Sequence, residues 1–377
     1  MRQYAGKIIC ALQKSFVFNT DTRRECNGIF FTGSVYSTTI RVYFQIMSKK
    51  IYILGYDIGG TKLAVSLGCS DGTVLASERL ANKDTLPDEI LPQLVEISQR
   101  MVAENNLTMD QIRAFGISSP GKADYPNGIM ISPTNNPLWK NVHIRSYMEK
   151  NLGIKGYFEN DAKCGMLAEW FFGAGRNCSN AIYLTMSTGI GAGIIVNGHL
   201  LQGAIGCGGE VGHMVIEPNG RQCNCGLVGC YEAYCGGRAI AQYLQQELKD
   251  QPDSGIVKAA GGKLENIDLV ALEKAVRAGD DYACKVWDDM CRRNAQAYGM
   301  LIMAFNPEKL ILGTIAWAAG DLFMQPVMKY IKDYAWEMSL NSCQIVTSAL
   351  RRDIGSYAGM AAALNGLYEA GEYQIQS

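Results

Sequence analysis

One histidine and three cysteines stand at spacings that could close around a single metal ion. They are His213, Cys223, Cys225 and Cys230, with glycines between them that would let the backbone turn tightly. Thiolate sulfur and imidazole nitrogen both suit Zn²⁺, and four protein ligands would leave no open coordination position. The pattern therefore predicts a structural zinc site. The alternative is three unrelated thiols and a histidine whose ring bonds to a backbone carbonyl.

Two glycine-rich turns could face phosphate oxygens. The first follows an apolar strand pattern and reads Asp57-Ile-Gly59-Gly60-Thr61-Lys62, and the second lies within residues 184–196. Glycine lets backbone amides approach a ligand closely, Asp57 could hold Mg²⁺ through water, and the Thr61 hydroxyl could donate to phosphate. Glycine pairs also occur in ordinary hairpins. Neither turn matches a Walker A loop or opens a helix with Gly-x-Gly-x-x-Gly, which disfavours P-loop and nicotinamide chemistry.

A carboxylate, Asp161, comes between these turns, where a short apolar strand ends and a helix is expected over 163–172. Its position is typical of a helix N-cap, which is the alternative to a chemical role. The segments 116–121 and 132–139 combine small residues, amides and an aromatic ring, which suits a sugar. Asparagine side chains both donate to and accept from hydroxyls, although a polar surface loop has the same composition.

Composition bounds the class of protein. The chain has 377 residues, is 48% hydrophobic and 19% charged, and carries a formal net charge of -1, which fits about two globular domains. A net charge this close to zero gives no sign of the basic surface that nucleic-acid binding requires. The 13 cysteines are scattered through a long chain, which favours a reducing cytoplasm over a disulfide scaffold. No apolar run approaches the roughly 18 residues of a membrane span, and residues 8–12 are too short for a signal-peptide core.

The first residues lack the periodicity of a folded element. Residues 1–46 show neither a strand nor a helix period before the strand-like segment that begins at Ile51. We therefore expect residues 1–48 to be an extension outside the fold, with Met47 as the initiator or the preceding segment dispensable.

The remaining pattern alternates strands and helices in the manner of an α/β protein. Strands are expected over 51–57, 62–68, 73–80, 112–117, 156–159, within 181–196, and over 309–312 and 343–347. Helices are expected over 89–104, 233–248, 268–278, 281–305, 321–335 and 355–370.

Six motifs in this order resemble the ROK family of repressors, open reading frames and kinases. The resemblance covers about residues 50–370. The motifs read Asp57-x-Gly-Gly-Thr-Lys62, Ser-Pro-Gly121, Asn160-Asp161, Ser-Thr188-Gly189-x-Gly191-x-Gly193, Gly-Glu210-Val-Gly-His213 and Cys223-x-Cys225-Gly-x-x-Gly-Cys230-x-Glu232.

The resemblance implies the actin/hexokinase-like, ribonuclease H-like duplicated α/β fold, with ATP and a sugar in the cleft between two domains. The last helix would return to the first domain. A smaller domain would then comprise 49–162 plus 355–377, and a larger domain with the zinc loop would comprise 163–354.

The family's roles map onto this chain residue by residue. Asp161 looks like the general base that takes the proton of the sugar 6-hydroxyl. The sugar ligands implied are Gly121, Asn135, Asn160, Asp161, Glu210, His213 and Glu232. The residues implied at the nucleotide and its Mg²⁺ are Asp57, Gly59, Gly60, Thr61, Lys62, Thr188, Gly189, Gly191 and Gly313.

Two details of the resemblance concern the metal loop and the nucleotide. One ring nitrogen of His213 would bind zinc while the other faces the sugar, so that the ion fixes the imidazole and positions Glu210 and Glu232. Thr314 stands where relatives usually have a second glycine after Gly313. Its Cβ and hydroxyl would reshape the adenosine pocket, so nucleotide affinity stays open.

These observations leave several functions open. The first is an ATP-dependent hexose kinase with glucose as the leading substrate, and N-acetylmannosamine, N-acetylglucosamine or fructose as alternatives. The second is a sugar-responsive transcriptional regulator, for which the extension is too short and unpatterned to be a helix-turn-helix domain. The third is a non-catalytic sugar sensor. The resemblance also implies a homodimer.

Overall fold

The computed structural model describes residues 50–375, apart from residue 61, residues 83–84 and residues 134–136. The expected extension over 1–48 and the proposed start at Met47 lie outside the described residues. Lys50–Ser377 form one compact unit.

The first sheet has five strands in the order β3-β2-β1-β4-β7. The strands are β1 (Tyr52–Ile58), β2 (Lys62–Cys69), β3 (Val74–Ala81), β4 (Ile112–Ser119) and β7 (Gly156–Asn160). β1, β2 and β3 pair antiparallel, whereas β4 and β7 continue the sheet in parallel. The interior strand β4 is buried along nearly its whole length, as expected for a strand that is covered on two faces. The edge strand β3 alternates between half-buried and exposed residues.

The second sheet repeats this topology. Its order is β10-β9-β8-β11-β12, with antiparallel pairing among the first three strands and parallel pairing among the last three. The strands are β8 (Ala181–Met186), β9 (Ile190–Val196), β10 (His199–Leu200), β11 (Lys309–Leu312) and β12 (Gln344–Thr347). The two sheets are therefore copies of one arrangement, and a small ribbon of β5 (Lys122–Asp124) and β6 (Ile129–Ser132) is added after β4.

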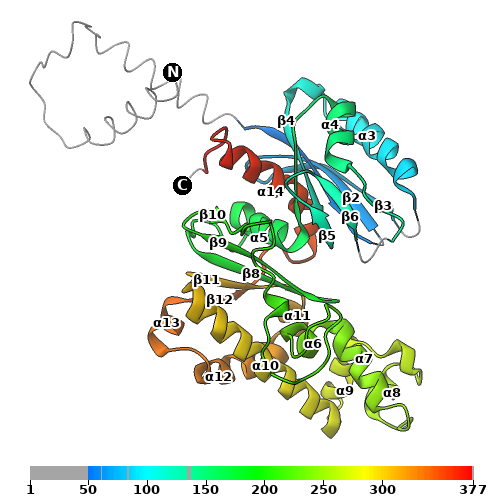
Figure 1. Cartoon of the computed structure of the whole chain (residues 1–377), viewed down its shortest axis with the longest axis vertical. Coiled ribbons are helices and arrows are strands. Elements are labelled where there is room, and N and C mark those ends of the chain that lie inside the picture. Colours follow the sequence, from blue (N-terminus) through cyan, green and yellow to red (C-terminus); the bar gives the residue numbers. More distant parts are fainter. Residues whose placement is uncertain (1–49, 61, 83–84, 134–136, 376–377) are drawn as a thin grey trace, which may run out of the picture. The chain divides into compact units, whose positions relative to one another are not determined.

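Helices cover both faces of the sheets in layers (Figure 1). α3 (Pro87–Glu104) and α4 (Ile144–Leu152) pack on one face of the first sheet. α5 (Asp161–Phe172) and α14 (Ile354–Glu369) share one core with residues of both sheets. The far face of the second sheet carries a larger helical layer, consisting of α6 (Tyr231–Cys235), α7 (Gly237–Glu247), α8 (Gly255–Ala259), α9 (Leu269–Arg277), α10 (Asp281–Phe305), α11 (Thr314–Ala319), α12 (Asp321–Tyr330) and neighbouring turns.

The remaining short elements connect these layers. They are α13 (Glu337–Ser342) and the 3₁₀ helices η1 (Met109–Gln111), η2 (Val211–His213), η3 (Leu264–Asn266), η4 (Ile331–Asp333) and η5 (Arg351–Asp353).

α14 touches the first sheet backbone to backbone. A Cβ added to Gly116 of β4 would lie 2.1 Å from the carbonyl oxygen of Gly359 and 2.4 Å from the amide nitrogen of Ala363. A Cβ on Gly55 of β1 would lie 2.4 Å from the amide nitrogen of Met360. No side chain fits at such distances, so glycines set the spacing between this helix and the sheet.

The expected elements are confirmed for most of the chain. α10 spans 281–305 as expected, because the Asp280 side chain caps its start and Asn306 takes a left-handed conformation with φ 43° at its end. Two of the expected helices differ in this layer. The single helix over 233–248 is two helices, α6 and α7, because the backbone of Gly236 is extended between them. The helix over 321–335 also ends early, at Tyr330, and continues as η4.

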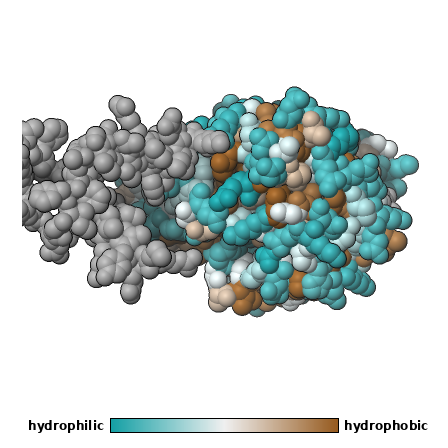
Figure 2. Space-filling view, turned by 90° about the horizontal axis from the view of Figure 1, so that it is seen from above, coloured by the Kyte–Doolittle hydropathy of each residue, from teal (hydrophilic) through white to brown (hydrophobic). Residues whose placement is uncertain are grey.

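None of the helices in the part of the chain that the structure describes has the length and apolar character that a bilayer crossing needs. On the face shown in Figure 2, hydrophilic residues predominate and hydrophobic residues gather in small separate groups.

Gly116→Ala tests the close contact between α14 and β4. The added Cβ must displace the backbone of α14, so we expect the free energy of unfolding to fall by about 3 kcal/mol or more. Gly153→Ala is the control, because its Cβ would meet open space and only its φ of 72° opposes the change, at a cost of about 1 kcal/mol. Urea denaturation of both variants measures the difference, and equal losses would contradict the packing argument.

Candidate active site and metal centre

Asp161 is the first residue of α5, directly after β7 ends. The N-cap is Asn160, whose side-chain oxygen accepts hydrogen bonds from the amides of Ala162 at 3.0 Å and Lys163 at 3.3 Å. The interpretation of Asp161 as an N-cap is therefore wrong, as is the expected helix start at residue 163. Because Asn160 satisfies the free amides, the Asp161 carboxylate is not needed as the cap.

The Asp161 carboxylate lies in a site that favours its neutral form. Burial raises its pKa, the charge of Glu210 raises it further, and the hydrogen bond that Asp161 Oδ1 accepts from the Ala162 amide at 2.8 Å opposes both. A carboxylate held in this way has a higher proton affinity than a solvated one, which is the property that a general base requires.

Asp57 lies near the end of β1 and faces the same region. Its Oδ1 accepts a hydrogen bond from the Ser118 hydroxyl of β4 at 2.9 Å, and a Cβ on Gly355, in the first turn of α14, would lie 2.9 Å from its Oδ2. Burial raises the pKa of Asp57 to about 6, the Ser118 hydrogen bond lowers it, and the charge of Asp161 raises it. Asp161 is therefore close enough for its charge to raise the pKa of Asp57.

The first glycine turn joins β1 to β2. Gly59 is held by the fully buried Asn82, whose side-chain nitrogen donates to the Gly59 carbonyl at 2.6 Å, and Thr85 in turn donates to Asn82 at 2.6 Å. Gly60 is half-buried and Lys62 is exposed at the start of β2. Thr61 lies outside the described residues.

The second glycine turn joins β8 to β9 and is tied to the helices that follow the metal loop. The Glu232 carboxylate of α6 accepts a hydrogen bond from the Ile190 amide at 2.7 Å, and a Cβ on Gly189 would lie 2.5 Å from the same oxygen. The amide of Arg238 donates to the Thr188 carbonyl at 2.9 Å. Glu232 and the turn residues Thr188, Gly189 and Gly191 therefore belong to one connected region.

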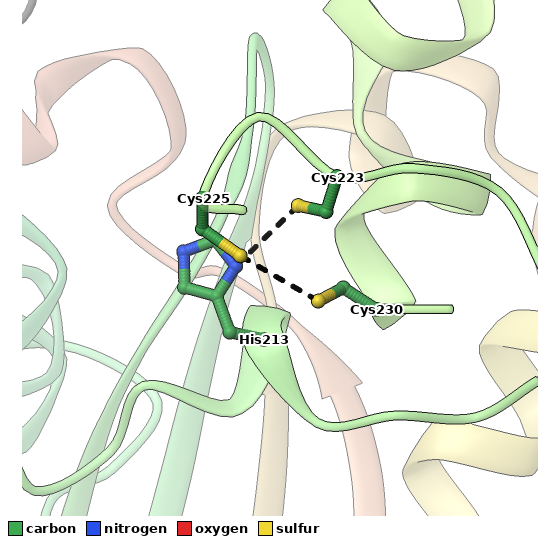
Figure 3. A group of neighbouring side chains, drawn as sticks. All are labelled: His213, Cys223, Cys225 and Cys230. Carbon is green, nitrogen blue, oxygen red and sulfur yellow. Dashed lines mark hydrogen bonds between the residues drawn. The ribbon is translucent and has the colours of Figure 1, made fainter. Parts of the chain in front are cut away.

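Four predicted metal ligands converge in the structure (Figure 3). His213 is on η2, Cys223 and Cys225 are in the loop that follows, and Cys230 directly precedes α6. The four ligand atoms all lie within 4.8 Å of one another. Cys223 Sγ is 3.7 Å from His213 Nδ1, and Cys225 Sγ is 3.7 Å from Cys230 Sγ.

These distances fit a tetrahedral zinc ion. With Zn–S near 2.3 Å and Zn–N near 2.0–2.1 Å, ligand atoms of a regular tetrahedron lie about 3.8 Å apart for two sulfurs and about 3.6 Å for sulfur and nitrogen. Because Nδ1 of His213 faces the sulfurs, Nε2 is left on the other side of the ring. The chemistry and spacing of the four residues thus suit a closed structural site.

Glu210, Gly121 and Asn135 are three further residues that the sequence analysis predicted. Glu210 directly precedes η2 and is exposed, and its charge reaches Asp161. Gly121 has φ 92° and its carbonyl accepts from the Tyr125 hydroxyl at 2.9 Å. Asn135 lies outside the described residues.

Gly313 cannot be replaced without a clash. Its amide donates to the Leu184 carbonyl at 2.8 Å, and a Cβ there would lie 2.8 Å from the Tyr183 hydroxyl. Thr314 is exposed and begins α11.

A buried ion pair beside Asp161 escaped the sequence analysis. The Lys163 ammonium lies 3.8 Å from Glu159 Oε1, with the two side chains only 4% and 9% exposed. Lys163 also donates to Gln202 Oε1 at 2.9 Å and to the Gly206 carbonyl at 2.7 Å, and Gln202 donates to Glu159. The first turn of α5 is thereby fastened to residues 201–209, the glycine loop, which leads directly into Glu210.

Tyr125 is a second residue that the motifs did not indicate. The Asn160 side-chain nitrogen donates to its hydroxyl at 3.3 Å, its ring packs 5.3 Å from that of Phe158, and it faces Gly206 of the glycine loop. The ribbon after β4, the Asn160 cap and the glycine loop therefore meet at one aromatic side chain. The only sequence signal was its place just after the sugar-like segment that ends at Gly121.

Known proteins resemble this chain over most of its length. The family model described as ROK family matches residues 53–366. A glucokinase of Thermotoga maritima is 36% identical over 309 residues, which are 81% of this chain and 95% of that protein. A xylose repressor of Bacillus spizizenii is 31% identical over 354 residues, which are 91% of this chain and 85% of that protein.

The architecture is shared as well. A solved structure of a ROK hexokinase from Thermus thermophilus matches with a TM-score of 0.74 at 26% identity, over 85% of this chain and 100% of that chain. The duplicated sheets and this likeness confirm the expected actin/hexokinase-like fold class. Motifs, topology and the family match agree, and the chain belongs to the ROK family.

Proposed function

We propose that this protein is an ATP-dependent sugar kinase that phosphorylates the 6-hydroxyl of a hexose, with glucose as the leading substrate. The observation that carries the proposal is the placement of Asp161: a carboxylate with a raised pKa, exposed at the start of α5 and within electrostatic reach of Asp57 and Glu210. The similarity to a glucokinase over 95% of that protein supports the same reaction and the same sugar.

Asp161 would act on the proton of the attacking hydroxyl. As the sugar 6-oxygen forms its bond to the γ-phosphorus, the bond to the bridging oxygen of ATP breaks, ADP leaves, and the hydroxyl proton passes to the Asp161 carboxylate. The raised pKa prepares this group to take a proton, and the Asn160 cap fixes the helix turn on which it sits.

The two glycine turns would hold the phosphates. Phosphoryl transfer depends mainly on positioning and on neutralising charge, and Mg²⁺, when bound, supplies much of that neutralisation. Asp57 offers carboxylate oxygens of the kind that Mg²⁺ prefers, and its chain neighbours Gly59 and Gly60 offer amides. Thr61, Lys62, Thr188, Gly189, Gly191 and Gly313 complete the nucleotide set that we propose.

The sugar would be held from both sides of Asp161. Asn160 still has one side-chain N–H to offer, since its oxygen caps α5 and its nitrogen donates once, to the Tyr125 hydroxyl. Glu210, His213 and Glu232 would contact hydroxyls, along with Gly121 and Asn135. Zn²⁺ bound by His213 Nδ1 and the three cysteines would leave Nε2 to face the sugar and would fix the ring.

We also propose a homodimer and a division into domains of 49–162 plus 355–377 and of 163–354, as the family resemblance implies, and a cytoplasmic location, as the scattered cysteines favour. α5 is continuous across the expected boundary at residue 162.

A regulator is the second candidate, because a xylose repressor is 31% identical over 91% of this chain. A kinase and a regulator would both bind a sugar, but only the kinase requires the carboxylate of Asp161, because it must take a proton during phosphoryl transfer. Among kinases, N-acetylglucosamine, N-acetylmannosamine and fructose remain alternatives to glucose.

Asp161→Asn tests the general base. The amide keeps the shape and can still accept from the Ala162 amide, but it takes no proton, so we expect kcat to fall by roughly 10²–10⁴-fold with little change in sugar binding. In the parent protein, kcat should fall as the pH is lowered through a pKa above 3.8, because the base is then protonated. The assay is coupled ADP release with Mg-ATP.

The same assay decides the sugar. Glucose, N-acetylglucosamine, N-acetylmannosamine and fructose are compared as acceptors, with Asp161→Asn as the blank. Sugar binding without turnover in the parent protein would favour a sensor or regulator, and full turnover in the variant would eliminate Asp161 as the base.

Cys225→Ala tests the metal centre. Loss of one of four ligands should release zinc, and because His213 and Glu232 flank the site, KM for the sugar should rise about 10–100-fold. Zinc content by elemental analysis and KM are measured together. Cys207→Ala is the matched control, since Cys207 is an exposed thiol in the neighbouring glycine loop. A zinc-free Cys225→Ala protein with unchanged kinetics would separate metal from sugar binding.

Lys163→Met tests the ion pair that fastens the glycine loop. The loop should loosen, and KM for the sugar should rise about 10-fold while kcat changes less. The single variant also leaves Glu159 buried without its partner, which costs about 3–5 kcal/mol of stability. Glu159→Gln combined with Lys163→Met removes both charges, so stability should recover while KM stays high. Recovery of KM together with stability would reduce the pair to a structural role.

A further inference from the structure

The tip of the first glycine turn lies beyond the sheet that carries it. The last paired residues of β1 and β2 are Ile58 and Leu63, so strand pairing does not hold Gly59 and Gly60. A Cβ on Gly59 would lie 2.6 Å from the Lys62 carbonyl oxygen, which shows how tightly the chain reverses there. The peptide that joins the two glycines must therefore be fixed by a group outside the strand ladder.

Asn82 is the residue that fixes this peptide. Its side-chain nitrogen donates to the Gly59 carbonyl at 2.6 Å, and Asn82 is fully buried. In a trans peptide the carbonyl and the N–H of the next residue point in opposite directions. Because the Gly59 carbonyl faces the buried Asn82, the Gly60 amide points the other way, out from the interior.

Two further hydrogen bonds fasten Asn82 to the core of the first sheet. Its side-chain oxygen accepts from the Thr85 hydroxyl at 2.6 Å, so the amide must present its nitrogen to Gly59. The Thr85 carbonyl accepts from the Trp139 indole nitrogen at 3.0 Å. Trp139 is fully buried in the core that α3 and α4 share with the first sheet, where close packing holds its ring. We call Asn82, Thr85 and Trp139 the relay.

The peptide held by the relay is bonded on one side only. The Gly60 amide finds no hydrogen-bond acceptor among the residues that the structure describes, and Gly60 is half-buried rather than enclosed. An asparagine that served only to close a loop would satisfy the carbonyl without leaving the neighbouring amide open, since most backbone groups away from water are paired. An open amide in a glycine turn is the kind of donor that binds phosphate oxygens.

We propose that Asn82, Thr85 and Trp139 are positioning residues for phosphoryl transfer, which aim the Gly60 amide at a phosphate oxygen of the nucleotide. The inference rests on the proposed function, because that function assigns a phosphate to the first glycine turn. A donor that is oriented before the charge arrives needs no reorganisation during the reaction, so it stabilises that charge better than a donor that must first turn. The relay supplies this orientation without touching the ligand.

Nuclear magnetic resonance tests the orientation of the Gly59–Gly60 peptide. Glycine labelled with ¹³C at the carbonyl and ¹⁵N at the amide gives a selective signal for Gly-Gly pairs. The chain has four such pairs, which are Gly59-Gly60, Gly208-Gly209, Gly236-Gly237 and Gly261-Gly262. In the ligand-free protein, Asn82→Leu should shift the Gly60 signal and leave the other three in place. In the parent, Mg²⁺ with AMPPNP should move the Gly60 amide proton downfield as it bonds to phosphate.

Kinetics test the role of that peptide. Asn82→Leu removes the donor at similar side-chain volume, so KM for ATP should rise about 10-fold or more and kcat should fall, with KM for the sugar unchanged. Thr85→Val keeps Asn82 but frees its amide, and should cause a smaller loss of the same kind. Thr85→Ser keeps the hydroxyl and should match the parent. A loop that had merely lost stability would show no such preference for ATP and no rescue by serine.

Ser98→Ala is the matched control for stability. Ser98 is also fully buried, its hydroxyl donates to the Leu94 carbonyl at 2.6 Å, and its oxygen lies 2.6 Å from the Tyr56 hydroxyl oxygen. This hydrogen bond lies in the same core but outside the relay. Its loss should lower Tm about as much as Thr85→Val does, with KM for ATP unchanged.

The outcomes separate this inference from the proposed function. A parent protein that neither binds AMPPNP nor turns over a sugar would overturn the proposed kinase, and the phosphate role of the relay with it. In a parent that does turn over, an unmoved Gly60 signal in Asn82→Leu would overturn the relay alone. So would a rise in KM for ATP no larger than that of Ser98→Ala. A moved signal together with a selective loss of ATP binding, absent from Thr85→Ser, would support the relay.

Discussion

The burial of α5 between the two sheets is the constraint on which the rest of the structure depends. Its apolar residues share one core with Ile53 and Ala114 of the first sheet and with Tyr183 and Ile311 of the second. A helix buried on all sides cannot turn or slide, so Asp161 at its first position is held as firmly as the core itself. The one carboxylate buried within the helix also has its hydrogen bonds. Glu169 is fully buried and accepts from the Ser348 hydroxyl and from the amides of Ala349 and Leu350.

A metal ion bound by His213 and the three cysteines would impose a second, more local constraint. The chain from η2 to α6 contains little regular structure, and four side chains converging on one point take the place that a hydrophobic core has elsewhere. An ion at this point would fix His213 and the start of α6 together, and α6 holds Glu232 against the β8–β9 turn. The Glu232 carboxylate thus joins the loop that would contact the sugar to the turn that would hold the phosphates.

The sequence predicted the fold class, most elements and the metal cluster, because strong periodicity and ligand spacing are local signals. It failed where local signals compete. Asn160 and Asp161 are both good caps, and only the backbone geometry decides that the first one caps α5. Gly236 divides what the apolar pattern presents as one helix. The pairing of Lys163 with Glu159 and the glycine loop joins residues up to 43 positions apart, and no spacing rule reveals it.

The glycine contacts between α14 and the first sheet have a consequence for synthesis. The sheet is built from residues 52–160, but the helix that closes one of its faces ends at residue 369. During translation the completed strands must wait, with that face uncovered, for more than half of the chain to emerge. Premature termination anywhere before α14 would therefore leave the earliest part of the protein the most prone to aggregation. However long the truncated chain is, it lacks the helix that covers this face of the first sheet.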